Sequence, residues 1–285
     1  MSDWEKLFDN LQWRYGDARH GGQRDDWPTA LPEPPALWQA LSGRASVRAF
    51  QKTKPTLDEL RTLSALALAA PSKSDLQQRD IILITDERQM ARMKSLLAEQ
   101  TWISGSPALV IFCANNHRQR LLHKMRGHAF ANDHLDAFFN ASVDAAIALA
   151  TFVLAAEAAG LGTCPISAIR NKADEASTIL DLPDHVFPVA GLAVGQAAET
   201  PLPSLRLSLS CTVHENNYSG TDPCPEIEVY DRRRARVQPY QTQRQAGTFG
   251  FTEPYTWSED KARQYSRPER ADFGTFIRSK GFSLD

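Results

Sequence analysis

Two arginines and a serine lie within five residues in the stretch 43–50, GRASVRAF. Arg44 and Arg48 are four residues apart with Ser46 between them, so their side chains can converge on one anion. A planar guanidinium matches the geometry of a phosphate and keeps its charge at any working pH. The stretch precedes a proline-bounded turn and a helix. It predicts a phosphate site, with a solvated basic turn as the alternative.

A second stretch, residues 160–171 (GLGTCPISAIRN), combines two glycines, a proline and an arginine. Its glycines follow a predicted helix rather than a strand, which argues against a Rossmann dinucleotide site. The sequence has no P-loop, no H-E-x-x-H and no G-x-S-x-G pattern, and its Ser, His and Asp residues lack the spacing of a hydrolytic triad. We interpret the two stretches as opposite ends of one pocket.

Four histidines, His117, His123, His128 and His134, suggest a metal site at first sight. Their spacings match no common ligand pattern, so we expect no metal there. We predict instead that residues 117–134 form a charged, irregular helical cover.

Composition excludes several classes of protein. The chain has 285 residues, enough for a real core in one large domain or two small ones. A net charge of −2 gives no case for binding nucleic acid or a membrane surface. Four scattered cysteines favour a reducing cytoplasm over a disulfide framework. The N-terminus lacks a signal-peptide core, and the most apolar segment, residues 145–159, falls short of the roughly 20 residues of a membrane span. We therefore expect a soluble intracellular protein.

Helices alternate with short apolar strands along most of the chain, as in an α/β or α+β sandwich. Thr56 and Glu59 have the spacing of a capping box at the start of a helix. A long helix from about 138 to 159 is apolar all round, so we expect it at the centre of a core or along a dimer interface. The predicted helices span 36–42, 57–70, 87–98, 138–159, 172–180, 258–266 and 272–280, and the predicted strands span 81–85, 108–114 and 188–195.

The two ends of the chain look different from its middle. Trp4, Leu7, Phe8 and Leu11 have the spacing of a short amphipathic helix, and glycines and prolines at 21–35 break regular structure, so we expect an arm over the surface. Residues from about 196 onward predict an extended arm with late helices. Its basic run at 232–236 is interpreted as a solvated face.

Several of these stretches together resemble the FMN-dependent nitroreductase family. Residues 44–50, 70–77, 160–166 and 188–195 occur in the order and spacing of that family. Arg206-Leu207, residues 213–218 (VHENNY) and residues 256–258 (TWS) resemble its NADPH-dependent nitro/flavin reductase subgroup, which has a long C-terminal arm. The resemblance covers roughly residues 40–285.

The resemblance implies an α+β fold, a nitroreductase-like three-layer sandwich with a mixed, mainly antiparallel central sheet flanked by helices. It also implies a homodimer with FMN between the subunits. Residues 1–35 would be an N-terminal extension and residues 36–285 the FMN-binding domain. Within that domain, residues 200–285 would be a C-terminal arm that packs on the partner.

The resemblance also assigns the phosphate end of the cofactor site. Arg44, Ser46 and Arg48 would hold the FMN phosphate and ribityl chain, with Ala45 contributing its backbone. Arg170 would reach the phosphate from the other side. Arg206 matches an arginine that contacts the phosphate of FMN or of the nicotinamide cofactor.

The same resemblance places other residues around the flavin ring. Gln100 would lie near the pyrimidine edge, and a backbone N–H in the stretch Pro165-Ile166-Ser167 would meet the flavin N5. Four more residues would come from the second subunit and lie under the flavin ring or close to it. They are Ser72, Ser74, Asp75 and Gln77.

Three positions depart from the family pattern. Asp75 stands where an asparagine is usual, Gln78-Arg79 where an apolar pair is usual, and Ser167-Ala168 where glycines are usual. A carboxylate beside a flavin disfavours its reduced anion. Asp75 therefore either points away from the ring or alters the redox potential.

The function that the resemblance implies is an FMN-dependent NAD(P)H oxidoreductase that reduces nitroaromatics, quinones or flavins. Hydride would pass from NADPH or NADH to FMN and on to the acceptor in a ping-pong cycle, so no catalytic side chain is expected. One alternative is a flavin enzyme of the same fold with another acceptor, such as a reductive dehalogenase or an enoate-type reductase. Another is a flavin-binding dimer without turnover.

Overall fold

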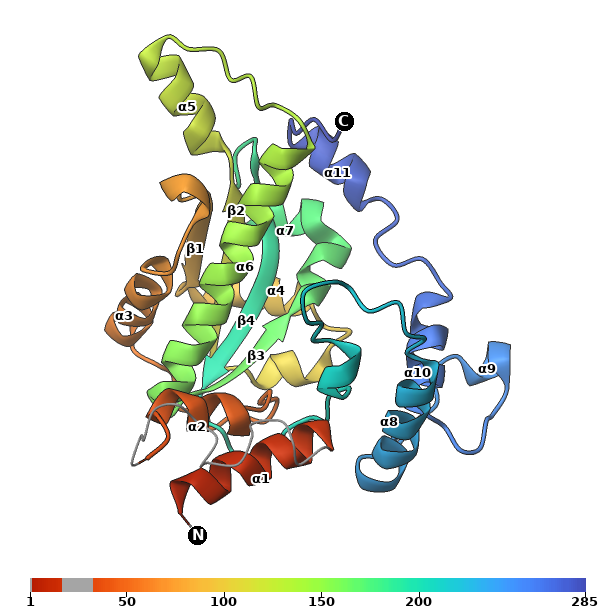
Figure 1. The fold of residues 1–285 in the computed structure, drawn as a ribbon. Coiled ribbons are helices and arrows are strands. Elements are labelled where there is room, and N and C mark those ends of the chain that lie inside the picture. The colour runs from red at the N-terminus through yellow and green to blue at the C-terminus, as the bar shows by residue number, and fades with distance from the viewer. Residues whose placement is uncertain (1, 17–32) are drawn as a thin grey trace. The chain divides into compact units, whose positions relative to one another are not determined.

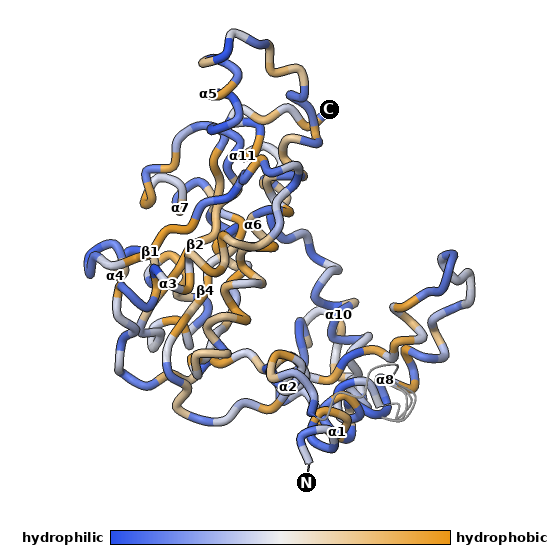
Figure 2. Tube along the Cα trace, turned by 60° about the vertical axis from the view of Figure 1, so that its left-hand side comes forward, coloured by the Kyte–Doolittle hydropathy of each residue, from blue (hydrophilic) through white to orange (hydrophobic). Residues whose placement is uncertain are grey.

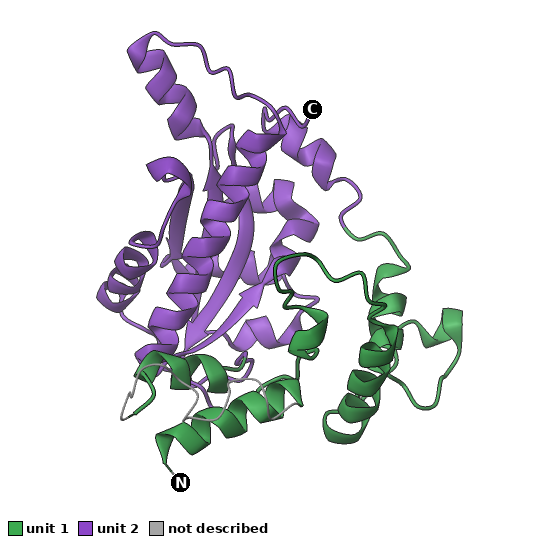
Figure 3. Ribbon diagram, in the orientation of Figure 1, with its two compact units in different colours: residues 1–45, 202–269 green, residues 46–201, 270–285 purple. Residues whose placement is uncertain are grey.

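The structure is a computed structural model that describes residues 2–16 and 33–285. The chain forms two compact units (Figure 3). Unit 1 comprises residues 1–45 and 202–269, and unit 2 comprises residues 46–201 and 270–285. The predicted breaks at Gly21, Gly22, Pro28 and Pro32 lie outside the described residues.

The core of unit 2 is a four-stranded sheet. Its order is β1-β2-β4-β3, and every pairing among these described strands is antiparallel, which agrees with the mainly antiparallel sheet expected. β2 is buried along its whole length, as the apolar run of residues 108–114 predicts. Hydrophobic colours follow the strands in Figure 2. The strands are β1 (Arg79–Ile84), β2 (Ala108–Asn115), β3 (Gly162–Ile166) and β4 (Val186–Gly195).

Helices cover both faces of this sheet, which confirms the three-layer sandwich (Figure 1). On one face lie α3 (Leu57–Leu68) and α6 (Leu135–Ala158), where Phe112 and Phe152 meet edge to face with ring centroids 5.6 Å apart. The other face is covered by α4 (Glu87–Leu96), α7 (Ala173–Ile179) and the short helices η3 (Thr101–Gly105) and η4 (Ser167–Lys172). The remaining helices of unit 2 are η2 (Lys73–Asp75), α5 (His117–Arg126) and α11 (Phe273–Ser279).

The start of α3 follows directly from the sequence. Thr56 Oγ1 accepts a hydrogen bond from the Glu59 N–H at 3.2 Å, and Glu59 Oε2 accepts one from the Thr56 N–H at 2.6 Å. The hydrogen bonds that the Thr56 N–H and the Thr56 hydroxyl donate to the Glu59 carboxylate hold the pKa of Glu59 below its usual value. The predicted capping box is confirmed.

α6 is longer than predicted, and this changes one expectation. The helix has 24 residues, and its mean hydropathy over an 18-residue window is 1.7. By length and composition alone, α6 could therefore cross a membrane. The expectation that no segment reaches that length is therefore wrong. Part of α6 packs on the sheet, where Ala141, Ala148 and Phe152 are fully buried. A core helix of this kind passes the same test of length and composition.

Unit 1 consists of helices and irregular segments among its described residues. Its helices are α1 (Asp3–Tyr15), α2 (Ala36–Gly43), the short η5 (Leu209–Cys211), α8 (Cys224–Val237), α9 (Ala246–Phe249) and α10 (Trp257–Tyr265). α1 packs on α2, with Trp4 stacked on Phe8 at 5.8 Å and edge-on to Trp38 at 6.4 Å.

α8 corrects the prediction of an extended arm after residue 196. The helix is charged along most of its length and buries Tyr230 and Asp231. Tyr230 packs on Trp257 with ring centroids 5.3 Å apart, and Asp231 accepts a hydrogen bond from the Ser258 N–H at 2.9 Å. These partners lie on α10, about 27 residues along the chain, so α8 depends on contacts that are not local to residues 224–237.

Candidate functional site

The first predicted stretch lies beside the second. The Val47 N–H donates to the Thr163 carbonyl of β3 at 2.9 Å. A Cβ added at Gly162 would lie 2.6 Å from Val47 Cγ2, so the glycine permits this close approach. Ser46 and Arg48 are therefore held next to the strand that leads to Pro165. The border between the two units falls between Ala45 and Ser46.

The segment 46–50 also meets η3. The Arg48 guanidinium lies over the ring of Trp102, 5.9 Å from its centroid, and the Arg48 side chain is exposed. Gln100, which precedes η3 by one residue, is exposed as well. Phe50 and Trp102 pack against the same core cluster, which contains Ile166. Three predicted parts of the site thus gather on one side of unit 2.

The turn from β3 into η4 presents some predicted residues and buries another. Pro165 and Ser167 are exposed, and the Ser167 carbonyl accepts a hydrogen bond from Arg270 Nη1 at 3.4 Å. The Ile166 side chain is 3% exposed and belongs to the core, so its backbone is the part that can reach a ligand. Arg170 is half-buried, and its Nη1 donates to the Val189 carbonyl at 2.6 Å.

The loop 71–78, which carries the other predicted ring contacts, has a strained backbone. Ser74, Asp75 and Gln77 adopt positive φ angles of 49°, 55° and 52°, a region that favours glycine. Residues in this region cost roughly 1–3 kcal/mol each and persist where the surroundings fix them. Ser72 Oγ accepts from the Gln77 N–H at 3.1 Å, and Gln77 Nε2 donates to Asp75 Oδ1 at 3.1 Å.

A buried ion pair fixes this loop. Arg79 and Asp144 have side chains 3% and 1% exposed, and Arg79 Nη1 lies 3.7 Å from Asp144 Oδ2. The Asp144 carboxylate accepts hydrogen bonds from the Lys73 and Gln78 N–H groups, both at 2.9 Å. The Arg79 Nη2 donates to the carbonyls of Leu68 and Ala70 at 2.8 and 2.7 Å. Sequence reasoning noted Arg79 as a departure and missed Asp144, which lies 65 residues away on α6.

α5 holds the loop from another side. Gln119 Nε2 donates to the Leu76 carbonyl at 2.7 Å, and Arg118 Nη2 donates to the Gln77 carbonyl at 2.8 Å. Asn116 Nδ2 donates to the buried Gln78 side chain at 2.8 Å. Among the described residues no group of three or more His, Cys, Asp or Glu side chains is placed to hold a metal ion.

The loop 71–78 and the β3 turn lie at opposite edges of the sheet. The loop leads into β1, and Pro165 to Ser167 end β3, while β2 and β4 separate these two edge strands. Within one chain, the two groups of predicted ring contacts therefore lie at opposite edge strands, with two strands between them.

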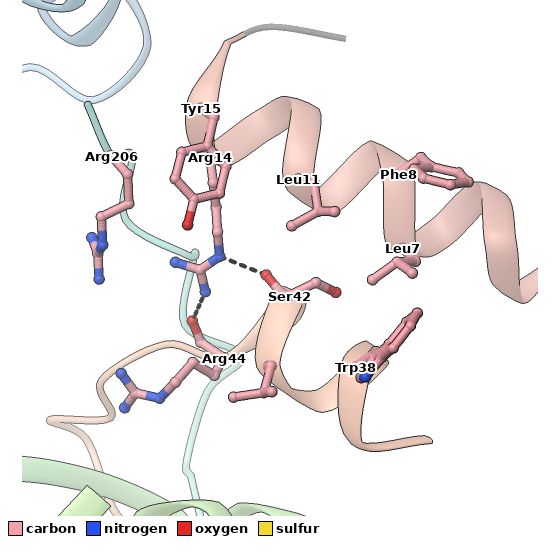
Figure 4. Close-up of a pocket in the computed structure, with 10 residues that line it drawn as sticks. Leu7, Phe8, Leu11, Arg14, Tyr15, Trp38, Ser42, Arg44 and Arg206 are labelled. Atoms are coloured by element: carbon pink, nitrogen blue, oxygen red, sulfur yellow. Dashed lines mark hydrogen bonds between the residues drawn. The ribbon is translucent and has the colours of Figure 1, made fainter. Parts of the chain in front are cut away.

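Arg44 and Arg206 line one cavity within unit 1. This cavity also borders Arg14, Tyr15 and Trp38 (Figure 4). Arg14 is buried, and sequence reasoning missed it. The one signal in the sequence was a basic residue in the last turn of an amphipathic helix. Ala45, next to Arg44, is half-buried.

The buried thiols of unit 2 are unsuited to nucleophilic chemistry. Cys113 and Cys164 lie in the hydrophobic core. Burial raises the pKa of the Cys113 thiol far above its ordinary value, with a smaller contribution from the charge of Asp80.

Comparison with known proteins gives two family matches and a set of similar chains. Residues 41–196 match the nitroreductase family, and residues 204–285 match the nitroreductase family C-terminal domain. An "FMN reductase (NADPH)" of Bacillus subtilis is 30% identical over 249 residues, 86% of this chain and 97% of the relative. An "Oxygen-insensitive NADPH nitroreductase" of Salmonella typhimurium is 29% identical over 247 residues, 86% of this chain and 97% of the relative. Among solved structures, NfrA2 of B. megaterium has a TM-score of 0.80 at 27% identity, covering 88% of this chain and 100% of that one.

Proposed function

The chain belongs to the nitroreductase family, and from that premise we propose that it is an FMN-dependent oxidoreductase. It takes electrons from NADPH or NADH and delivers them to nitroaromatics, quinones or flavins. The relatives named as an FMN reductase and an NADPH nitroreductase support this assignment. The observation that carries it is the hydrogen bond from Val47 to Thr163, which puts Ser46 and Arg48 beside the β3 turn.

The residues at the phosphate end suit FMN. Ser46 offers a hydroxyl and Arg48 an exposed guanidinium, and residues 43–50 contain no carboxylate. A phosphate monoester is close to a dianion at neutral pH, and charge-assisted hydrogen bonds from arginine are the strongest that a side chain gives it. In this proposal Arg170 supplies further positive charge within unit 2. Arg44 and Arg206, with the backbone of Ala45, are the candidate phosphate contacts of unit 1.

The flavin ring would lie against the β3 turn. Pro165 and Ser167 are exposed there, and the backbone of Ile166 can offer an N–H. Gln100 approaches from η3. The loop with Ser72, Ser74, Asp75 and Gln77 comes from the second subunit, because in one chain it lies at the opposite sheet edge.

A homodimer therefore belongs to the proposal. α6 packs one side on the sheet and leaves an apolar stripe exposed, including Phe139 at 59% and Val143 at 38%. Leu66 of α3 is 52% exposed. Exposed apolar residues of this kind mark a protein interface. We assign residues 36–285 to the FMN-binding domain, with residues 1–35 as an N-terminal extension and residues 200–285 as the arm that packs on the partner.

In this proposal the side chains of the protein bind and orient FMN and take no covalent part in the reaction. FMN, when bound, supplies the two-electron chemistry, and the protein supplies placement and charge. The arginines neutralise the phosphate, and the β3 turn fixes the ring. This division explains why no acid–base pair stands out near β3. A cytoplasmic location, where NADPH and NADH are available, fits four free cysteines.

The test is an anaerobic titration of the FMN-reconstituted protein with NADPH and with NADH, followed by flavin absorbance. We expect one equivalent of a nicotinamide cofactor to bleach the flavin and an added quinone or nitroaromatic to restore its colour. Arg48→Ala should weaken FMN binding about tenfold or more, while Arg61→Ala, an exposed arginine on α3, should not. A protein that takes up no FMN would contradict the proposal.

A further inference from the structure

The cavity in unit 1 has the size and lining of a small-molecule site. It measures about 470 Å³, within the range of roughly 300–1,000 Å³ for such sites. Its lining includes three arginines and no acidic side chain among the described residues. Aromatic and leucine side chains form the rest of its wall, with Ser42. The lining residues are Leu7, Phe8, Leu11, Arg14, Tyr15, Trp38, Leu41, Ser42, Arg44 and Arg206.

Arg14 is the centre of this arrangement. Its side chain is buried, and its guanidinium donates to three backbone carbonyls. Nε reaches the Ser42 carbonyl at 2.6 Å, Nη1 reaches the Ser204 carbonyl at 3.3 Å, and Nη2 donates to the Arg44 carbonyl. One side chain from α1 thus ties together two segments that are about 160 residues apart in the sequence.

The backbone of Arg14 makes a further tie. Its carbonyl accepts a hydrogen bond from the Arg206 N–H at 2.7 Å. Arg44 and Arg206 are therefore each joined to Arg14 by one hydrogen bond through their own backbone. Figure 4 shows the guanidinium of Arg14 next to Ser42, with the guanidiniums of Arg44 and Arg206 on one side of it and Leu7, Phe8 and Trp38 on the other. A group of cations beside an apolar wall suits an anion attached to an aromatic ring.

α1 lies outside the residues that the family matches cover, which begin at residue 41. Its contacts with residues 42–44 and 204–206 are therefore additional to what those matches describe. Other contacts strengthen the same junction. Asn10 Nδ2 donates to Ser42 Oγ at 3.1 Å, and Trp13 Nε1 donates to the Pro203 carbonyl at 2.9 Å.

We propose that helix α1 completes a phosphate site, in which Arg14 is a positioning residue that holds Arg44 and Arg206 together as one anion-binding pair. The ligand is a phosphate monoester carried by an aromatic heterocycle. That phosphate has two candidate sources, the phosphate of FMN and the 2′-phosphate of NADPH. For both sources the inference rests on the proposed function. The role of α1 is thus to fix the geometry of this pair.

Matched ligands test the proposal without measuring turnover. FMN and riboflavin differ by the phosphate, and NADP⁺ and NAD⁺ differ by the 2′-phosphate. Binding of all four to the purified full chain is measured by calorimetry, for the wild type, Arg14→Ala and the milder Arg14→Gln. We expect both variants to lose about tenfold in affinity for the phosphorylated member of one pair and to bind the other member as the wild type does. The pair that responds identifies the source of the phosphate.

Arg233→Ala is the matched control. The Arg233 guanidinium donates to the carbonyls of Gln12 and Arg14 at 3.3 and 3.2 Å, at the end of the same helix. The variant removes a stabilising contact of α1 and leaves the side chain of Arg14 in place. We expect a lower melting temperature and an unchanged preference for the phosphorylated ligands.

Two results would overturn the proposal. In the first, folded Arg14→Gln keeps the wild-type preference in both ligand pairs. In the second, Arg14→Gln and Arg233→Ala weaken both members of each pair equally, which would make α1 a purely structural element. A titration with inorganic phosphate separates this inference from the proposed function. A wild type that binds phosphate but not FMN, with Arg14→Gln losing phosphate, would refute the flavin function and support the anion site.

Discussion

Two segments of unit 2 are candidates for opposite sides of a cofactor, and they are held in different ways. Residues 46–51 are held by backbone pairing, from Val47 to Thr163 and from the Gln51 N–H to the Gln196 carbonyl, both at 2.9 Å. Residues 71–78 are held by side chains, above all by the buried carboxylate of Asp144 and the guanidinium of Arg79. The first segment has ordinary backbone angles, and the second has three residues at positive φ.

The difference shows what each segment needs from the rest of the fold. Backbone pairing leaves the side chains of Ser46 and Arg48 available to a ligand. A strained loop needs groups that fix its backbone from outside, and a buried charge does this strongly because both its hydrogen bonds and its ion partner are protected from water. The two segments should therefore respond differently to substitution.

The largest effect is expected for Asp144→Ala. The change leaves Arg79 buried without its carboxylate and removes the acceptor of the Lys73 and Gln78 N–H groups. We expect a loss of about 3–5 kcal/mol in the free energy of unfolding, measured by urea denaturation. Asp136→Ala, which removes an exposed carboxylate from the same helix, should cost less than about 1 kcal/mol. Equal losses in the two variants would show that the loop does not depend on buried charge.

Gly162→Ala should have the next largest effect, and it tests the segment held by its backbone. The new Cβ would lie 2.6 Å from Val47 Cγ2, and a buried β-branched valine has little freedom to move. We expect a loss of about 1–3 kcal/mol together with weaker retention of FMN. Gly105→Ala, where nothing lies within 4 Å of the new Cβ, is the control and should be close to neutral. If the Gly162→Ala variant is destabilised but binds FMN normally, the pairing of Val47 with Thr163 is not needed for the cofactor site.

Asp75→Asn tests the charge of the strained loop. Asparagine tolerates a positive φ about as well as aspartate, so the backbone is preserved. If the carboxylate lies near the flavin, removing about 1 kcal/mol of charge repulsion raises the midpoint potential by about 20 mV for a two-electron couple. Spectroelectrochemical titration measures this shift, with Asp58→Asn as an exposed control. An unchanged potential would place the carboxylate away from the ring.

The smallest effect is expected for Asp133. This residue pairs with Arg120 of α5, the helix that contacts the loop 71–78. Arg120 Nη2 lies 2.6 Å from Asp133 Oδ1, and this hydrogen bond holds the pKa of Asp133 below its usual value, against an opposing effect of burial. A lowered pKa in the folded state stabilises the protein above the unfolded pKa of about 3.9, and the gain is lost as pH falls through the folded value. Because the carboxylate is 40% exposed, we expect less than about 1 kcal/mol. The difference in stability between wild type and Asp133→Asn, measured at pH 7, 5 and 3, should shrink with falling pH. Growth of that difference at low pH would contradict this account.

Local signals in the sequence predicted much of unit 2. The capping box at Thr56, the fully apolar β2 and the alternation of helices and strands depend on neighbouring residues, and all are present in the structure. The two stretches around residues 44–50 and 160–171 were predicted as opposite ends of one pocket. In the structure Val47 pairs with Thr163, so residues 46–48 lie beside β3, and Gly162 permits this approach. The role of each site residue stays a prediction until ligands are measured.

What the sequence did not predict depends on distant partners. Asp144 acts on residues 73 to 79 from α6, and Arg14 acts on residues 42, 44 and 204 from α1. α8 is stabilised by residues of α10. Such charged or polar side chains have no periodicity that marks them as buried, so their surroundings become apparent when the fold brings the partners together.

The pairing of Val47 with β3 has one more consequence. β3 is an outer strand of the sheet, and outer strands carry backbone groups that can recruit a strand from another molecule. Val47 pairs with Thr163 on this strand and so shields part of it. A small molecule that steadied the segment 46–51 would thus also protect the open edge of β3 from pairing with strands of other molecules, and its loss during purification would favour precipitation.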